Sequence, residues 1–517
     1  VHRLNREEYA NAIRDLLGVD VDVTELLPSD GGDFGFDNIA AALTTSPLLL
    51  ERYLTTALRV SDLAVGNTDA PPTAAFYKIG VEVTQDQYME GLPLGTRGGT
   101  SVRHVFPADA EYVLAGRLLR TVAEGYVGVE GQDEPQQFVV TVDGEQVYSS
   151  AIGGPEDHEQ SGADILASRV VIDERMTSPR LPITAGPHEV AFTWVERPAV
   201  EQSVWQPPLR ATQEAHNPSG LPRLETAIIE GPYAATGISD TLSRERLLVC
   251  RPASAAEEAG CAEQIFATLA KRAFRRPVDA DDIAPPLQFF AQARAAGADF
   301  DGGIRAGVAR ILVSPSFLFR TEADPVDLAA GSAHRISDIE LASRLSFFMW
   351  SSIPDDELLD LAIAGRLANA SVLENQVRRM VADSRADALV ANFTGQWLQL
   401  RNLEQRVVPD LLLFPDFDDN LRKAFRRETE LLFANVLRED RSVVELLTAD
   451  YTFVNERLAR HYGVPGVYGA RFRRVQHTDP NRYGLLGHGS ILSLTSAATR
   501  TSPIIRGKYL MSNFLNN

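Results

Sequence analysis

The sequence has little lysine and lacks the short motifs of several common protein classes. Lysine occurs four times in 517 residues, so arginine carries nearly all the positive charge, and the formal net charge is −20. General nucleic-acid binding needs a basic face, and the acidic balance excludes it. No glycine-rich phosphate loop, GxSxG, HExxH or CxxCH occurs. These absences exclude the common nucleotide-binding, α/β-hydrolase, zinc-protease and covalent haem c classes.

Long apolar runs are also missing. No stretch of about 18 apolar residues occurs, so the sequence predicts no transmembrane segment. Val1 lies inside what reads as a capped helix, and Asn517 follows soon after another helix begins. We therefore expect the chain to be a fragment or a processed product, so a missing signal peptide does not bear on its compartment.

Cysteine is scarce and closely spaced. Cys250 and Cys261 flank a loop that contains proline, alanine, glutamate and glycine. This pattern suits a disulfide in an extracytoplasmic protein, with two buried free thiols as the alternative. Closing so short a loop would contribute roughly 3 kcal/mol. One cysteine pair with no nearby histidine supplies too few ligands for a zinc site.

The length and the hydrophobic period predict a multi-domain α+β protein. A chain of 517 residues is too long for one core. We expect mainly α-helical bundles with an inserted antiparallel β-sandwich of jelly-roll type, similar to carbohydrate-binding modules. The predicted units are an N-terminal helical domain at 1–66, the sandwich at 75–205, a helical domain with the cysteine pair at 222–325, a helical domain at 334–460 and the truncated start of a C-terminal domain at 461–517.

The N-terminal unit reads as two helices joined by an acidic loop. The first ends at Gly18. The second starts at residues 46–47, and its predicted buried stripe is Leu49, Leu50, Tyr53, Leu54 and Leu58. The loop between them carries Asp30, Asp33, Asp37 and Asn38, whose oxygens suit Ca²⁺ although their spacing does not fit an EF-hand. The alternative is that these side chains form turns and caps, with Phe34 and Phe36 in the core.

The stretch at 75–205 alternates with period two. Asp143-Gly144 predicts a hairpin turn, and Val190, Phe192 and Trp194 share one strand face. Jelly-roll sandwiches often bind carbohydrate, although a fold alone does not establish a function. The candidate sugar-stacking aromatics are Tyr88, Tyr126 and Trp205, with packing in the core or rim as the alternative.

The C-terminal half holds the candidate catalytic residues. Ser502 caps a predicted helix, Pro503 suits its first position, and Arg500 and Arg506 flank that start, which together suit an anion site. The alternative is that the arginines satisfy local carbonyls and carboxylates. His461 and His488 complete the candidates, which are His488, Arg500, Arg506 and His461.

A pair of carboxylates on a predicted helix at 420–437 is a further feature of this half. Glu428 and Glu430 stand beside Arg426 and Arg427. We interpret both carboxylates as members of surface salt bridges rather than as an acid–base pair.

Several stretches together resemble one family. They include RLNREEYANAIRDLL at 3–17, GFDN at 35–38, RAFRRP at 272–277, LASRLSFFMW at 341–350 and TRTSP at 499–503, with further stretches at 46–53, 91–99, 250–261 and 450–455. In this order they resemble the planctomycete cytochrome c domain-containing proteins, which are large exported chains built from domains of unknown function. The resemblance covers nearly the whole chain.

The resemblance implies no catalytic residue. It implies a haem c domain upstream of this chain or on a partner, and a further C-terminal domain after residue 517. Because CxxCH is missing, we expect no covalent haem in this chain itself. The one candidate cofactor that we expect here is Ca²⁺. We expect an extracytoplasmic protein of the periplasm or cell surface. Its expected activity is to bind polysaccharide, or to be accessory to polysaccharide use or to envelope redox work with a c-type cytochrome partner. The alternatives are a hydrolase or haem-partnered oxidoreductase with its site in the C-terminal helical half, and a structural surface protein.

Overall fold

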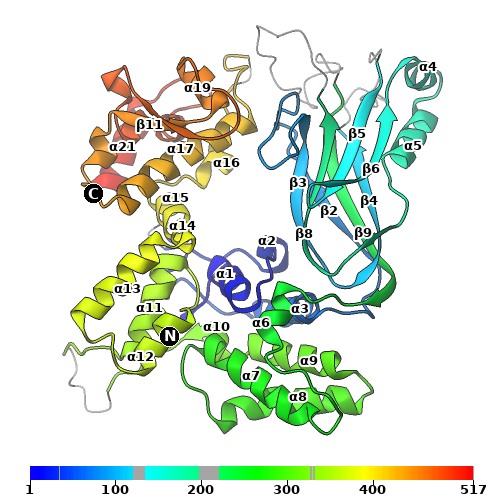
Figure 1. The fold of residues 1–517 in the computed structure, drawn as a ribbon. Coiled ribbons are helices and arrows are strands. Elements are labelled where there is room, and N and C mark those ends of the chain that lie inside the picture. Colours follow the sequence, from blue (N-terminus) through cyan, green and yellow to red (C-terminus); the bar gives the residue numbers. More distant parts are fainter. Residues whose placement is uncertain are drawn as a thin grey trace.

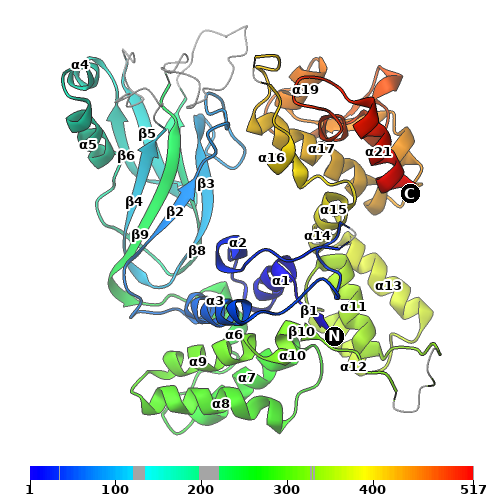
Figure 2. The same cartoon turned by 180° about the vertical axis from the view of Figure 1, so that it is seen from behind.

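The computed structural model describes residues 1–33, 35–119, 134–196, 221–325, 329, 332–410 and 412–515. The described chain mixes helices with antiparallel sheets, so the predicted α+β class is confirmed. Figure 1 shows helices α1 and α3 near the middle, with a two-sheet unit on one side and helical units below and on the other side. Figure 2 shows the same arrangement from behind. Within the described ranges no helix is long and apolar enough to cross a membrane.

The N-terminal helices are α1 (Arg6–Leu17), α2 (Val23–Leu26) and α3 (Pro47–Val65). Asn5 and Glu8 form a reciprocal capping box at the start of α1, which satisfies two backbone N–H groups that lack intrahelical partners. Gly18 ends α1 with φ 73°, a left-handed conformation that suits glycine, so the predicted helix end is confirmed.

The buried face of α3 differs from the predicted stripe. Leu49 and Tyr53 are buried, but Leu50, Leu54 and Leu58 are each about half exposed. The face that packs instead carries small residues, Ala57, Ala64 and their neighbours. Small side chains let α3 approach α9 (Phe300–Leu312) closely, so the more apolar leucines were a misleading guide to orientation.

The two-sheet unit contains two four-stranded antiparallel sheets with the orders β2-β9-β4-β7 and β3-β8-β5-β6. Val190, Phe192 and Trp194 are fully buried in a core that both sheets share, which confirms their common face. The strands are β2 (Thr73–Lys78), β3 (Thr96–Phe106), β4 (Asp109–Leu118), β5 (Gln136–Val142), β6 (Glu145–Ile152), β7 (Leu181–Ile183), β8 (Gly186–Val195) and β9 (Leu224–Gly237).

The predicted hairpin at Asp143-Gly144 is confirmed. It joins β5 and β6, and both turn residues have positive φ, 52° and 82°, as a two-residue hairpin of this kind requires. Helices α4 (Pro155–Ala163) and α5 (Ile165–Arg175) follow β6 and lie on the outer side of the unit.

The next unit is helical and packs on the N-terminal helices through one shared apolar core. Cys250 and Cys261 form a disulfide, which confirms the predicted pair. The two-residue strand β1 (His2–Arg3) pairs with β10 (Phe319–Arg320) and ties the N-terminus to the end of this unit. Its helices are α6 (Leu242–Leu247), α7 (Glu258–Phe274), α8 (Ala280–Ala295), α9 and α10 (Pro315–Leu318).

The remaining chain forms two packed groups with separate apolar cores. The first group contains α11 (Asp338–Trp350), α12 (Asp356–Ile363), α13 (Ala370–Ala382), η1 (Ser384–Ala386), α14 (Asp387–Leu389) and η2 (Val390–Thr394). Helix α15 (Gly395–Trp397) follows and packs its Trp397 on the second core. The second contains α16 (Asn402–Arg406), α17 (Asp419–Arg438), α18 (Glu445–Thr448), β11 (Tyr451–Val454), α19 (Glu456–Tyr462), β12 (Arg473–Gln476), η3 (Pro480–Arg482), η4 (Leu485–Gly487), α20 (Gly489–Leu494) and α21 (Pro503–Phe514).

Candidate functional site

A cleft opens between the two-sheet unit and the N-terminal helices, and we call it the sheet-edge cleft. Its volume is about 590 Å³. Strands β2 and β3 are the first strands of their sheets, so each presents an edge, and residues 73–77 and 103–105 of these two edges line the cleft. The opposite wall comes from α2, α3 and the loop before α2.

The sheet-edge cleft combines an exposed ring with polar groups. Phe76 lines it and is 58% exposed, which is unusual for so large an apolar side chain on a strand. Beside it, the Tyr77 hydroxyl lies 2.7 Å from Nδ1 of His104. Burial, followed by the charge of Arg59 and the proximity of His188, lowers the pKa of His104 to about 4, so the imidazole is neutral at pH 7.

The charged groups of the sheet-edge cleft have both signs. Arg103 of β3 forms an ion pair with Asp20 across the cleft at 2.7 Å. Arg59 of α3 lines the same wall and forms no ion pair with a described residue. An open aromatic face with hydroxyl, imidazole, carboxylate and guanidinium groups around it suits a polar, uncharged ligand that has both C–H faces and hydroxyls.

The predicted sugar-stacking residues are placed elsewhere. Tyr88 is half-buried, and its hydroxyl donates a hydrogen bond to the carbonyl of Leu92 at 3.1 Å. Tyr126 and Trp205 lie outside the described residues. Their role in ligand binding stays a prediction, while the described unit presents Phe76 as an exposed ring.

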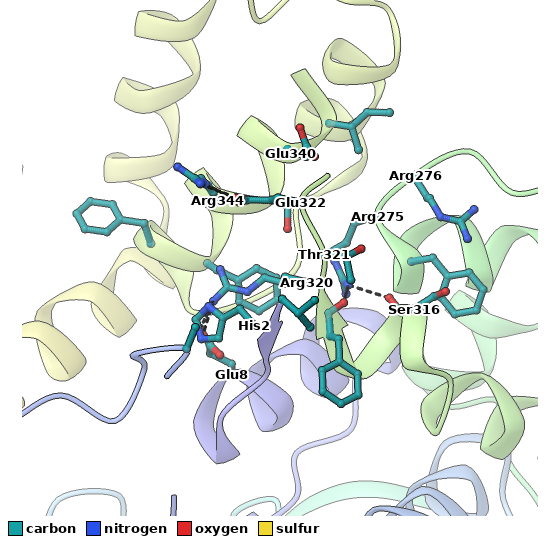
Figure 3. Close-up of a pocket in the computed structure, with 18 of the residues that line it drawn as sticks. His2, Glu8, Arg275, Arg276, Ser316, Arg320, Thr321, Glu322, Glu340 and Arg344 are labelled. Atoms are coloured by element: carbon teal, nitrogen blue, oxygen red, sulfur yellow. Dashed lines mark hydrogen bonds and ion pairs between the residues drawn. The ribbon is translucent and has the colours of Figure 1, made fainter. Parts of the chain in front are cut away.

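A second cavity, the junction cavity, lies where α1, α10, β10 and α11 meet. Its volume is about 590 Å³, and Figure 3 shows charged side chains of α1, β10 and α11 around it, with Ser316 of α10 nearby. Arg275 is almost fully buried there and donates hydrogen bonds to the carbonyls of Ala273, Ser316, Phe317 and Phe319. Burial and the charge of Arg320 lower the pKa of Arg275 to about 9.

The other charges of the junction cavity also have partners within the chain. Arg320 forms an ion pair with Glu8 at 3.2 Å, and its guanidinium lies 4.4 Å from the ring centroid of Phe347. Arg344 pairs with Glu322 through two hydrogen bonds (Figure 3). These pairs connect α1, β10 and α11, so the junction cavity holds an ionic joint between units.

Two of the predicted Ca²⁺ ligands, Asp30 and Asp37, are engaged by cations and amides of the chain. The Asp30 carboxylate accepts hydrogen bonds from Arg3 and from the backbone N–H of Arg6, both at 2.6 Å. Asp37 pairs with Arg401, Asp33 forms backbone turn bonds with Phe36, and Asn38 lines the junction cavity. In the described ranges no group of three or more His, Cys, Asp or Glu side chains could hold a metal ion. The Ca²⁺ site therefore stays a prediction.

A third cavity, the C-terminal cavity, lies in the last group of helices and has a volume of about 410 Å³. Its walls are mostly apolar and come from the loop before α17, from α17 and from α20. The apolar lining consists of Val407, Val408, Pro409, Leu413, Phe414, Pro415, Phe417, Leu421, Phe425, Leu492, Ala497 and Ala498.

Three arginines from different segments surround this cavity. Arg406 ends α16, Arg482 ends η3, and Arg500 lies in the loop before α21. Arg482 donates a hydrogen bond to the carbonyl of Gly487 at 3.2 Å and lies 4.4 Å from the ring centroid of Tyr462. Neither Arg406 nor Arg500 forms an ion pair with a described residue. Among the described residues of the lining, Asp416 supplies one carboxylate against the three guanidinium groups, so the charge around the cavity is mainly positive.

The four predicted catalytic residues are only partly brought together. His461 and Arg500 line the C-terminal cavity. His488 is 1% exposed and lies behind the wall, with Nδ1 3.0 Å from the Thr429 hydroxyl. Arg506 is not part of the described lining, and its Nε donates a hydrogen bond to Thr495 at 3.3 Å.

A fully buried carboxyl lies beneath the cavity floor. Glu428 accepts hydrogen bonds from the hydroxyls of Thr452 and Tyr462, each at 2.7 Å. Gly489, which lines the cavity, donates its N–H to the Tyr462 oxygen at 2.8 Å. Burial raises the pKa of Glu428 to about 7, although these hydrogen bonds and the charge of Arg482 oppose the shift.

The position of Glu428 corrects the surface interpretation of the carboxylate pair. Glu430 pairs with Arg426 and Arg427, which confirms its ion pairs, although its side chain is only 10% exposed. Glu428 is 0% exposed and forms no ion pair with an arginine of the described residues. Its Oε1 lies 4.0 Å from Nε2 of His488, whose ring is neutral because burial lowers the pKa of His488 to about 3. The signal was present in the sequence, because Glu428 follows Leu421 and Phe425 and precedes Leu432 at helical spacing, which places it on the apolar face. Arg482 was missed because its short turn gives no periodic signal.

Three segments of the chain match known families. Residues 2–66 match "Protein of unknown function (DUF1587)", residues 261–322 match "Protein of unknown function (DUF1595)", and residues 336–464 match "Protein of unknown function (DUF1592)". No curated protein and no solved structure matches the chain. None of the three matches is a haem c domain. Three segments of this chain are therefore similar to domains of unknown function, and these matches are consistent with the resemblance of the sequence to the planctomycete cytochrome c family.

Proposed function

We propose that this chain is an extracytoplasmic accessory protein that binds polysaccharide in the sheet-edge cleft. The observation that carries the proposal is the 58% exposed ring of Phe76 on the edge strand β2, beside the Tyr77–His104 pair and Arg59. A sugar ring has an apolar C–H face and hydroxyl edges. The phenyl ring can stack on the C–H face, and the polar groups of the cleft can form hydrogen bonds with the hydroxyls.

The strand order supports the proposal that the two-sheet unit is a jelly roll of the carbohydrate-binding-module type. Counted along the described residues of the unit, one sheet contains the first, third, sixth and eighth strands, and the other contains the second, fourth, fifth and seventh. The chain therefore crosses repeatedly between the sheets, as it does in an eight-stranded jelly roll with two Greek keys. Because the same fold serves many functions, the side chains of the cleft carry the argument for glycan.

The disulfide supports the extracytoplasmic part of the proposal. Cys250 and Cys261 are the two cysteines of the chain, and they are joined. Structural disulfides persist in oxidising compartments and are rare in the cytosol. The three matched domains add support, because they occur in a family of exported proteins. In that setting a c-type cytochrome domain or protein would be a partner, with its haem outside this chain.

The test is glycan binding by the full chain with its disulfide intact. We expect the wild-type protein to bind at least one soluble polysaccharide on an array or in affinity electrophoresis. Phe76→Ala should weaken that binding about five- to tenfold, because aromatic stacking contributes about 1 kcal/mol. A parallel measurement with a chelator tests whether the predicted Ca²⁺ takes part.

The matched control is Phe289→Ala, which removes an exposed phenyl ring, 44% accessible, from α8. It should leave binding unchanged. Absence of binding to every polysaccharide, or equal losses in the two phenylalanine variants, would reject the sheet-edge cleft as a glycan site.

A further inference from the structure

We propose that the C-terminal cavity binds a small anionic amphiphile, that is, a free molecule with one carboxylate, sulfate or phosphate head on an apolar body. This ligand class differs from polysaccharide, and the cavity lies in a different unit from the sheet-edge cleft. The proposal is therefore independent of the function proposed for the cleft.

The apolar walls require a ligand with an apolar body. Phe414, Phe417 and Phe425 line the cavity together with leucine, valine and proline side chains. Phe414 is 44% exposed and Leu413 is 58% exposed, so part of this lining faces open space. A volume of about 410 Å³ lies in the range of pockets that hold small organic ligands. Burial of such a body against these side chains is the main favourable contribution.

The arginines require an anionic head. Arg406, Arg482 and Arg500 reach the cavity from three separate segments, while the described lining contributes one carboxylate, that of Asp416. The formal net charge of the whole chain is −20, so this concentration of positive charge runs against the average of the molecule. A guanidinium binds a carboxylate or phosphate through paired, charge-assisted hydrogen bonds, which a neutral head cannot replace.

The floor of the cavity preserves this positive charge. A Cβ added at Gly489 would lie 2.1 Å from Cε1 of Phe425, so the floor is tightly packed and separates Glu428 from the ligand. Glu428 shares Arg482 as an electrostatic neighbour with the cavity. Because burial raises the pKa of Glu428 to about 7, this carboxyl is mostly protonated at the lower pH of the experiment below, and its charge then does not cancel that of Arg482.

His461 contributes a neutral, polar edge rather than a further charge. Its ring packs edge-on against Phe425, with 5.3 Å between the ring centroids. Desolvation and the charges of Arg457 and Arg482 lower the pKa of His461 to about 4. The neutral imidazole offers one donor and one acceptor to the ligand.

The experiment uses the full chain and the fluorescent fatty acid 11-(dansylamino)undecanoate, with its methyl ester as the neutral analogue. At pH 6.5 and low salt we expect the acid to bind at one site per chain with a rise in dansyl fluorescence, and the ester to bind at least tenfold more weakly. The double variant Arg406→Ala/Arg500→Ala should weaken binding of the acid at least tenfold and leave binding of the ester unchanged. Both side chains are exposed, so their loss leaves the core intact.

Two further variants separate the cavity from the rest of the surface. Ala498→Trp places a large ring at the lining and should abolish binding of both probes, with the melting temperature measured to show that the variant is folded. Arg366→Ala removes an exposed arginine of the preceding helical group and should change nothing. Equal affinity for acid and ester, or undiminished binding by Ala498→Trp, would overturn the proposal. So would sedimentation of the protein with phosphatidylglycerol vesicles in the absence of binding to the free probe, because the partner would then be a membrane surface.

Discussion

At the scale of single residues, Glu428 is the side chain with the clearest consequence for stability. Its ordinary pKa is 4.5, and burial raises the folded-state pKa to about 7. Folding therefore favours the protonated carboxyl. The stability that this preference gives is fully present below pH 4.5 and is lost as the pH rises through the folded pKa near 7. The difference corresponds to about 3 kcal/mol.

Glu428→Gln tests this linkage, because glutamine keeps the shape and cannot ionise. We expect the variant and the wild type to have similar free energies of unfolding at pH 4.5, measured by denaturant titration. At pH 8 the variant should be more stable by about 2–3 kcal/mol, since the wild type must then bury a charge. Glu430→Gln is the control on the same helix, because Glu430 pairs with Arg426 and Arg427. If the free energy of unfolding changes between pH 4.5 and pH 8 by the same amount in Glu428→Gln as in the wild type, the change does not come from Glu428 and the assignment is wrong.

Some residues could be predicted from the sequence and others could not. The cysteine pair, the Asp143-Gly144 turn and the end of α1 at Gly18 were predicted, because each depends on local chemistry that few residue types satisfy. The placing of His488 behind the cavity wall could not be predicted. It depends on how α20 packs against α17, and that packing joins residues far apart in the chain.

At the scale of elements, the packing of helix on helix decides what the hydrophobic pattern leaves open. Gly307 of α9 lies against Phe266 of α7, and an added Cβ would lie 2.1 Å from Cζ of that ring. A side chain there must displace the ring. Helix α3 is a second example in which the sequence pattern did not decide the buried face. Its leucines were predicted to be buried, but the close approach of α9 selects the face with small residues.

Gly307→Ala and Gly260→Ala form a matched pair of tests on packed helices. Both positions lie in helix interiors or first turns, where alanine has the better helix propensity. Gly307→Ala should lower the free energy of unfolding by about 1–3 kcal/mol through overpacking. Gly260→Ala meets no atom within 4 Å and should raise stability by up to about 1 kcal/mol. Equal effects of the same sign in thermal unfolding would show that propensity, not packing, governs Gly307.

At the scale of the whole molecule, the N-terminal helices connect the other units. They share one apolar core with α6 to α10, they form one wall of the sheet-edge cleft, and they meet α11 at the junction cavity. Figures 1 and 2 both show α1 and α3 between the two-sheet unit and the helical groups. The mixed fold class could be predicted from the change of hydrophobic period, but this central position could not, because no local pattern encodes which units meet.

Arg320 is the side chain on which this connection depends most. It is the last residue of β10, pairs with Glu8 of α1 (Figure 3) and lies over the Phe347 ring of α11, so it connects three of the joined segments. Glu8 is 4% exposed, and burial raises its pKa even with Arg320 present. Removing the arginine would leave a buried carboxylate whose remaining interaction is the capping bond from the N–H of Asn5.

Arg320→Ala should therefore cost about 3 kcal/mol, the usual consequence of removing one partner from a buried pair. Because the loss falls on the joint between units and not within one core, we expect calorimetry to show a broader or more divided unfolding profile than that of the wild type, with the helical group of α11 to α13 separating first. The control is Arg335→Ala, which removes the ion pair between Arg335 and Asp338. Because the Arg335 side chain is 60% exposed, this change should lower the free energy of unfolding by less than about 1 kcal/mol. If Arg320→Ala lowers the melting temperature without changing the shape of the transition, the units are held together by their apolar contacts, and the ionic joint only adds to stability.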